Sequence, residues 1–234
     1  MLLIKNTSQL SLVAAFDEAC LGYSSNVAQA LGPISVQLKQ GQRFVLTGDN
    51  GSGKSLLLKT LAGVLPILKG QLTIFTERIA YLSQEHSRPD VWPLTGYDWF
   101  EMMGADRPLG KACPLSSGLL DRRLDQLSGG QWQRVRLSAV FASGADLIIL
   151  DEPTNHLDHF AKTLLADRLH ALPSNCCLLM TSHDSLLMEG LDVETLKLEK
   201  LKIERLELET LKMEESKAEW ITAKQHSEFA SHVG

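Results

Sequence analysis

The chain has 234 residues, of which 44% are hydrophobic and 22% charged, and its net charge is −5. This composition predicts a soluble globular protein with one large domain, or one domain with a subdomain, and the acidic balance argues against free nucleic acid as a partner. No apolar run reaches the roughly 18–20 residues that cross a bilayer, and the N-terminus lacks the pattern of a signal peptide. The cysteines (Cys20, Cys113, Cys176 and Cys177) show no metal-ligand spacing. Cys176 and Cys177 are adjacent in an apolar run, so we expect these two to be reduced core thiols, in a cytosolic protein.

The first predicted elements are a strand, a glycine-rich loop and a helix. RFVLTG at 43–48 is a short apolar run that predicts a buried strand, and SLLLKTLAGVL at 55–65 has helical character. The loop between them, GDNGSGKS at 48–55, fits the pattern G-x-x-x-x-G-K-[ST]. Its glycines let backbone N–H groups surround phosphates, while Lys54 supplies a positive charge and Ser55 a hydroxyl for Mg²⁺. The pattern therefore predicts a nucleotide phosphate site.

The stretch 85–126 differs from its surroundings. It follows a short predicted strand, RIAYLSQ at 78–84, and contains several prolines but no strong strand run. We interpret it as an inserted, mostly helical subdomain. Its apolar residues form the core of the subdomain or an exposed docking patch, and both interpretations can hold for different residues: Trp92, Tyr97, Trp99, Phe100, Met102 and Met103.

A second glycine-rich turn follows in LSGGQWQRVR at 127–136. Glycine is unfavourable inside a helix, but a Ser-Gly-Gly turn at a helix start presents bare N–H groups to an anion. The sequence thus predicts two anion-binding turns in one chain.

Two continuous apolar runs, ADLIILDEP at 145–153 and NCCLLMTSHD at 175–184, predict buried parallel strands. The helical stretch 159–172 lies between them, and this alternation predicts an α/β fold with a parallel sheet. Asp151 ends the first run, where a carboxylate can hold Mg²⁺. Strand alternation predicts that Glu152 points the other way, and its carboxylate is suited to orient and deprotonate a water.

The C-terminal region carries a five-residue repeat at 195–214, TLKLE-KLKIE-RLELE-TLKME. Neither a helix nor a strand turns this spacing into one apolar stripe. A strand or hairpin followed by a solvated extension is one interpretation, and a partner-binding helix is the other.

GDNGSGKS, LSGGQ and LIILDEP, in this order, resemble the nucleotide-binding domain of an ATP-binding cassette (ABC) protein over about residues 15–204. The resemblance implies a P-loop NTPase core with a parallel sheet, an N-terminal antiparallel β-subdomain and a helical signature subdomain inserted at 85–139. The ATP-binding domain then spans 1–204, and 205–234 form an extension that is partly disordered or helical.

The resemblance also implies roles for individual residues. Catalysis is expected from Glu152, His183, Lys54 and Gln84. ATP is expected to contact Tyr23, Gly48, Asp49, Asn50, Gly51, Ser52, Gly53, Lys54, Ser55 and Leu56. Mg²⁺ is expected at Ser55, Gln84 and Asp151. The ATP of a second subunit is expected to contact Ser128, Gly129, Gly130, Gln131 and Asp158.

The same resemblance implies a head-to-tail dimer, either a homodimer or a pseudo-dimer with a second cassette, that sandwiches ATP and closes upon binding it. The implied function is the ATP-hydrolysing subunit of an ABC transporter, attached to membrane permease subunits at the inner face of the membrane. WPLTGYDWFEMMG at 92–104 is loosely similar to a segment of metal-ion importers, except that Gly96 stands where they have valine. Alternatives are a soluble cassette ATPase acting on ribosomes, because LDEPTNHLD is also typical of those proteins, and a free ATPase or regulator.

Overall fold

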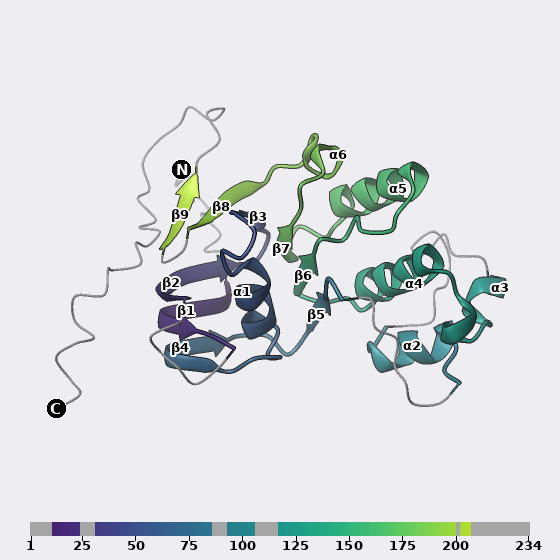
Figure 1. Ribbon diagram of the computed structural model, residues 1–234, viewed down its shortest axis with the longest axis horizontal. Coiled ribbons are helices and arrows are strands. Elements are labelled where there is room, and N and C mark those ends of the chain that lie inside the picture. The colour runs from purple at the N-terminus through teal and green to yellow at the C-terminus, as the bar shows by residue number, and fades with distance from the viewer. Residues whose placement is uncertain (1–10, 24–30, 86–92, 106–116, 200–201, 207–234) are drawn as a thin grey trace, which may run out of the picture.

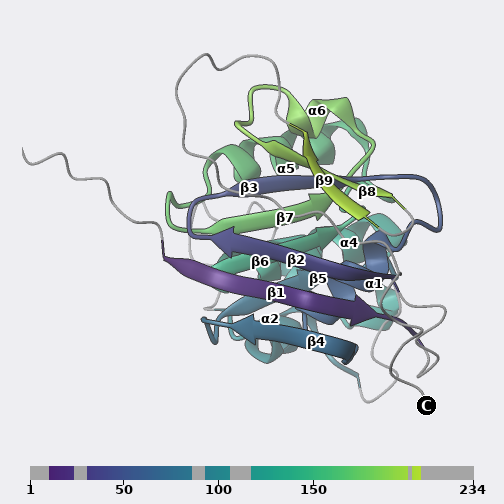
Figure 2. The same ribbon diagram turned by 90° about the vertical axis from the view of Figure 1, so that its left-hand side faces the viewer.

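The computed structural model describes residues 11–23, 31–85, 93–105, 117–199 and 202–206 of the chain. Two sheets lie beside each other, and a group of helices extends from one side of them (Figure 1). The smaller sheet is antiparallel, with strand order β2-β1-β4, and faces the viewer in Figure 2. Its strands are β1 (Leu12–Leu21), β2 (Leu31–Lys39) and β4 (Ile67–Ile74). The expected N-terminal antiparallel subdomain is confirmed.

The larger sheet has six strands in the order β5-β6-β7-β3-β8-β9. The first five are mutually parallel, and β9 is antiparallel to β8. The bounds are β3 (Arg43–Thr47), β5 (Ile79–Leu82), β6 (Leu147–Asp151), β7 (Cys177–Thr181), β8 (Glu194–Glu199) and β9 (Lys202–Leu206). The predicted strands at 43–48, 78–84, 145–153 and 175–184 all form, so the predicted parallel sheet is confirmed.

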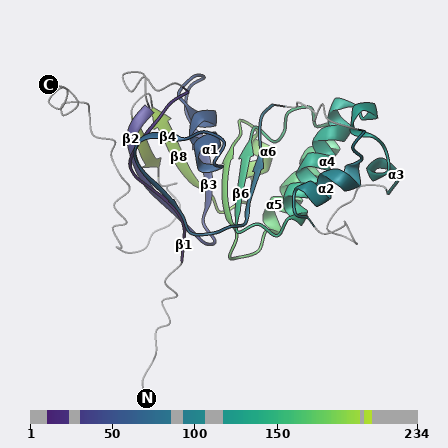
Figure 3. The same ribbon diagram turned by 90° about the horizontal axis from the view of Figure 1, so that it is seen from below.

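Both faces of the parallel sheet are buried, which explains why its strands are continuously apolar. Along β6, Leu147 and Ile149 face a core shared with the antiparallel sheet and α1 (Lys54–Leu61). Ile148 and Leu150 face a second core, covered by α4 and α5. Figure 3 shows α1 between the two sheets and the other helices on the far side. The elements that cover this far face are α4 (Gly129–Ala142), α5 (His159–His170) and α6 (Ser185–Met188).

The inserted region is helical where the structure describes it. It contains α2 (Gly96–Met102), α3 (Ser117–Leu120), the 3₁₀ helix η2 (Leu124–Gln126) and most of α4. Phe100 and Trp132 are buried in its core, and the ring of Trp99 packs edge-on against Trp132 at 4.9 Å. The core interpretation is therefore confirmed for these aromatic residues. Met102 is 62% exposed, and Trp92 lies outside the described residues.

The start of the five-residue repeat forms two strands, in which β8 pairs in parallel with β3 and in antiparallel with β9. The strand-or-hairpin interpretation is confirmed for residues 195–199 and 202–206 of the repeat, and a partner-binding helix is wrong for these residues. Residues 207–234 lie outside the description. Among the described helices none is both long and apolar enough to span a bilayer.

The predicted core thiols are confirmed for Cys176 and Cys177, which are free and buried, and Cys20 is free and buried as well. Burial raises the pKa of Cys176 to about 11 and that of Cys177 to about 12. Both thiols are therefore protonated and inert at neutral pH. Cys113 lies outside the described residues.

Candidate active site

The glycine-rich loop at 48–55, from here on called the phosphate loop, connects β3 to α1 at the edge of the parallel sheet. Gly53, the residue before α1, has φ 104°, a left-handed conformation that glycine adopts without strain. Lys54 Nζ donates hydrogen bonds to the carbonyl oxygens of Gly48 (2.6 Å) and Asp49 (3.1 Å), so the side chain folds back over the loop. The ammonium group and the free amides at the start of α1 together favour an anion at this place.

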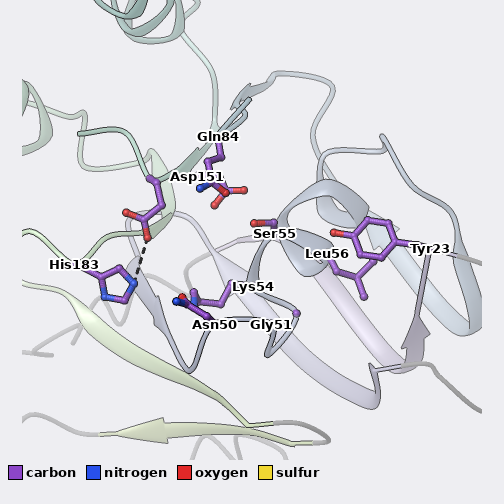
Figure 4. Close-up of a pocket in the computed structure, with 11 residues that line it drawn as sticks. Tyr23, Asn50, Gly51, Lys54, Ser55, Leu56, Gln84, Asp151 and His183 are labelled. Carbon is purple, nitrogen blue, oxygen red and sulfur yellow. Dashed lines mark ion pairs between the residues drawn. The ribbon is translucent and has the colours of Figure 1, made fainter. Parts of the chain in front are cut away.

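The strand order brings the other predicted residues to the same edge. β6, β7 and β3 are neighbours, and the carboxyl ends of parallel strands lie together. The phosphate loop after β3 therefore meets Asp151 at the end of β6 and His183 just beyond β7. A cavity of about 250 Å³ lies between them (Figure 4). It is lined by Tyr23, Asn50, Gly51, Gly53, Lys54, Ser55, Leu56, Gln84, Asp151, Glu152 and His183.

The acidic residues differ in burial and partners. Asp151 is 2% exposed, and its Oδ1 accepts a hydrogen bond from the Thr181 hydroxyl at 2.8 Å. Its Oδ2 is buried and has no hydrogen-bond partner in the described structure. Glu152 Oε1 lies 3.5 Å from Nε2 of His183, whose side chain is 70% exposed. An exposed imidazole beside a half-buried carboxylate can reach a substrate that enters from solvent.

The predicted orientation of Glu152 is wrong. Strand alternation would place the side chains of Asp151 and Glu152 on opposite faces, yet both line one cavity. The reason is that β6 ends at Asp151, and Glu152 has φ 49°, a left-handed conformation outside strand geometry. Such conformations of non-glycine residues are uncommon and are concentrated at active sites.

The expected ATP-contacting residues of the loop divide between two cavities. Gly48, Asp49 and Ser52 line a neighbouring cavity of about 510 Å³ rather than the one that holds Asp151. Asn50 and Gly51 line both, so the loop forms the wall between them. Lys197 and Leu198 of β8 line the second cavity, a contribution that the sequence did not reveal because it depends on the pairing of β8 with β3.

Tyr23 lies at one end of the cavity, near Leu56 (Figure 4), and its side chain is 68% exposed. An exposed aromatic ring is unfavourable in isolation, but it offers a flat surface on which a base can stack. This position fits the predicted contact with adenine.

We expect Tyr23→Ala to lower ATP affinity about 10-fold, because stacking of a base on an aromatic ring contributes roughly 1–3 kcal/mol. Tyr23→Phe keeps the ring and should bind ATP like the original chain. Calorimetric titration with ATP and with inorganic tripolyphosphate checks this. Equal losses for the two ligands would show that Tyr23 does not contact the base.

The LSGGQ residues do not line either cavity. Ser128 is the N-cap of α4: its hydroxyl accepts a hydrogen bond from the Gln131 N–H, and the Gln131 side chain accepts one from the Ser128 N–H. Asp158 is the N-cap of α5, where its carboxylate accepts a hydrogen bond from the Ala161 N–H at 2.8 Å, and it also pairs with Arg134. Ser128 and Gly129 are exposed at the start of α4, where the first N–H groups of a helix have no partner within the helix. Their contact with ATP on a second subunit stays a prediction.

Two buried residues of α4, Gln133 and Arg136, were missed in the sequence. The Arg136 guanidinium donates to the carbonyl (2.7 Å) and hydroxyl (2.9 Å) of Ser83, next to Gln84. The Gln133 amide donates to the Pro153 carbonyl at 2.9 Å, just after the strand-end acids. Burial lowers the pKa of Arg136 to about 10, which still leaves it charged at neutral pH. Helix α4 is thus hydrogen-bonded to the two segments that carry Gln84 and Glu152 into the cavity.

Known proteins resemble this chain in sequence and in fold. The ABC transporter family model matches residues 31–155. The zinc import ATP-binding protein ZnuC of Vibrio cholerae is 30% identical over 182 residues, which make up 75% of this chain and 69% of ZnuC. The ATP-binding protein Uup of Caulobacter vibrioides is 38% identical over 154 residues, or 64% of this chain, and this match spans only 24% of Uup.

Among solved structures, the dimeric ATP-binding cassette MJ0796 with ADP and Pi bound matches with a TM-score of 0.66 at 19% identity. The match covers 82% of this chain and 97% of that one, and it shows a shared fold. The family match spans the phosphate loop and the strand-end acids, which line the cavity, and also the LSGGQ turn. The chain therefore belongs to the ABC transporter family, with the architecture of its ATP-binding cassette.

Proposed function

We propose that this chain binds and hydrolyses ATP as the cassette subunit of an ABC transporter and powers transport through separate membrane subunits. The supporting observation is one cavity that joins a phosphate loop to a buried carboxylate, a second carboxylate and a histidine. This combination can hold a nucleotide and also attack it with water, whereas a module that only binds nucleotide needs no second acid.

In this proposal each group has one task. Lys54 and the amides at the start of α1 bind the β- and γ-phosphates. Glu152 orients the attacking water and accepts its proton, and His183 stabilises charge at the γ-phosphate. Their 3.5 Å separation lets both groups act at the same phosphate.

The residues fit a divalent cation. Asp151 Oδ2 is a buried carboxylate oxygen without a hydrogen-bond partner in the described structure, and Ser55 and Gln84 line the same cavity. Oxygen ligands of this kind suit Mg²⁺, which is usually held by one or two protein groups together with substrate phosphates. Mg²⁺ bound there would neutralise charge on the phosphates.

We also propose a head-to-tail dimer. The exposed Ser128 and Gly129 lie outside the cavity of their own subunit, and the related MJ0796 cassette is dimeric with ADP and Pi bound. In such a dimer the start of α4 would supply N–H groups to the partner's γ-phosphate. ATP binding and dimer closure would then be thermodynamically linked.

The membrane partner can be tested by affinity capture. Tagged Glu152→Gln is expressed in cells, the cells are solubilised gently with ATP present, and the captured proteins are identified. Recovery of a polytopic membrane protein supports the transporter subunit, attached at the inner face of the membrane. Recovery of ribosomes, or of this protein alone, would contradict it.

A soluble cassette ATPase is the second candidate, because the segment LDEPTNHLD at 150–158 is also typical of such proteins. The similarity to ZnuC favours import instead. The capture experiment separates the two, because only the transporter subunit brings down a membrane protein.

Metal ions are the proposed class of transported substrate, and the proposed direction is import. This proposal is based on the similarity to the zinc import protein ZnuC and on the segment around Gly96. The structure gives that segment a local role as well. Thr95 and Asp98 form a capping box at the start of α2, so both serve the helix. A Cβ on Gly96 would lie 2.8 Å from Leu120 Cα, which explains why glycine replaces valine here. The similarity to ZnuC therefore carries more of the proposal than this segment does.

Gly96→Val should lower the free energy of unfolding by about 1–3 kcal/mol, because the added side chain collides with the backbone of α3. Gly118→Val is the matched control, since no atom lies within 4 Å of a Cβ built on Gly118. Urea denaturation of both variants makes the comparison. A Gly96→Val chain as stable as the control would show that α3 does not pack closely on α2.

A further inference from the structure

Thr181 is the last residue of β7, is completely buried and pairs in register with Asp151 of β6. Its hydroxyl lies between the two acidic residues of the site. The hydroxyl donates to Asp151 Oδ1 at 2.8 Å and accepts a hydrogen bond from the backbone N–H of Glu152 at 2.9 Å. Thr181 stands in the apolar run at 175–184, where the sequence assigned it no role, and it does not line the cavity.

The first bond determines how the carboxylate of Asp151 is used. A hydroxyl has one proton, and here it is donated to Oδ1. Oδ2 is then left as the buried oxygen without a hydrogen-bond partner in the described structure. A carboxylate restrained in this manner presents one defined oxygen to a cation, as expected of a group that orients a metal ligand.

The second bond determines where Glu152 points. Its left-handed φ of 49° is unfavourable for a non-glycine residue and persists only if neighbouring groups hold it. The Thr181 hydroxyl accepts the N–H of this residue, and the Glu152 carbonyl accepts a bond from Asn155 at 3.3 Å. These two bonds hold the turn that brings the Glu152 side chain into the cavity.

We propose that Thr181 is a positioning residue of the ATPase site. Its single hydroxyl orients Asp151 toward Mg²⁺ and holds the backbone turn that places Glu152 beside the γ-phosphate. The inference rests on the proposed hydrolysis of ATP at this site. One buried hydroxyl thereby sets the positions of Asp151, the metal ligand, and Glu152, the base, relative to each other.

The test compares Thr181→Val, which keeps the shape but loses the hydroxyl, with Thr181→Ser, which keeps the hydroxyl. ATP affinity is measured by calorimetry with Mg²⁺ and with EDTA, and the ratio of the two affinities reports how strongly the metal supports binding. We expect Thr181→Val to reduce this ratio about 10-fold and kcat at least as much, because a hydrogen bond to a charged group is lost. Thr181→Ser should restore both.

Thr60→Val is the matched control. Thr60 is also fully buried, but its hydroxyl donates only to the Leu56 carbonyl within α1. If Thr181→Val fails to fold, Thr181→Ala and Thr181→Ser give the same comparison, because they differ only by the hydroxyl. The inference would be overturned if Thr181→Val and Thr60→Val had the same kcat and the same ratio of ATP affinity with Mg²⁺ to ATP affinity with EDTA.

Asp151→Asn distinguishes failure of the inference from failure of the proposed function. If the ratio of ATP affinity with Mg²⁺ to ATP affinity with EDTA falls in Asp151→Asn but is unchanged in Thr181→Val, only the role of Thr181 is refuted. If Asp151→Asn also keeps the ratio, the proposed cation site itself is wrong.

Discussion

Glu152→Gln is expected to bind ATP with nearly unchanged affinity and to lose at least about 100-fold in turnover, the range that general base catalysis contributes. Glutamine keeps the size of the side chain but cannot accept a proton from water. Because hydrolysis would no longer release the closed state, the variant should accumulate as a nucleotide-bound dimer. Phosphate release measures turnover, and gel filtration with ATP measures the dimer.

Glu189→Gln is the control, since Glu189 is exposed and outside the cavity. It should hydrolyse ATP at the original rate and show no trapped dimer. Hydrolysis by Glu152→Gln at the same rate as Glu189→Gln would mean that Glu152 is not the base. His183 would then be the next candidate, because its Nε2 lies beside Glu152 at the same cavity.

Lys54→Ala should lower the affinity for ATP itself by about 10- to 100-fold, since it removes a charged hydrogen-bond donor to the phosphates. The lysine already bridges the Gly48 and Asp49 carbonyls, so its loss also loosens the loop. Direct titration calorimetry measures the effect. Adenosine, which carries no phosphate, should bind both forms equally.

Lys69→Ala provides a control for the change in net charge. Lys69 is exposed on β4 and does not line the cavity. If Lys69→Ala and Lys54→Ala weaken ATP binding equally, the effect is one of overall charge and the phosphate role of Lys54 is refuted.

Much of the site could be predicted because its chemistry lies in short contiguous segments. The run from Gly48 to Ser55 specifies a loop whose glycines and lysine suit phosphates, and any strand–loop–helix context places it similarly. The continuous apolar runs before Asp151 and His183 likewise indicate strands buried on both faces. Since carboxyl ends of parallel strands share an edge, their meeting at one cavity follows from the fold class.

Other features depend on contacts between residues far apart in the chain. Strand alternation places Glu152 on the wrong side, because the left-handed turn that redirects it is held by Thr181, 29 residues later. The buried hydrogen bond from Arg136 to Ser83 likewise cannot be predicted from a local pattern, because the two residues are 53 positions apart in the chain. Gly96 departs from the resembled segment because of Leu120, whose position only the packing of α3 on α2 defines.

The sequence by itself determined the phosphate loop, the strands that present the acids and the family to which the chain belongs. These three features follow from local residue spacing, because consecutive residues determine the backbone geometry of a loop and the apolar pattern of a buried strand. The tertiary structure alone decided which oxygen of Asp151 is left without a partner, where Glu152 points and what holds it there. A hydrogen bond between neighbouring strands depends on their register, and register is a property of the folded sheet rather than of either segment.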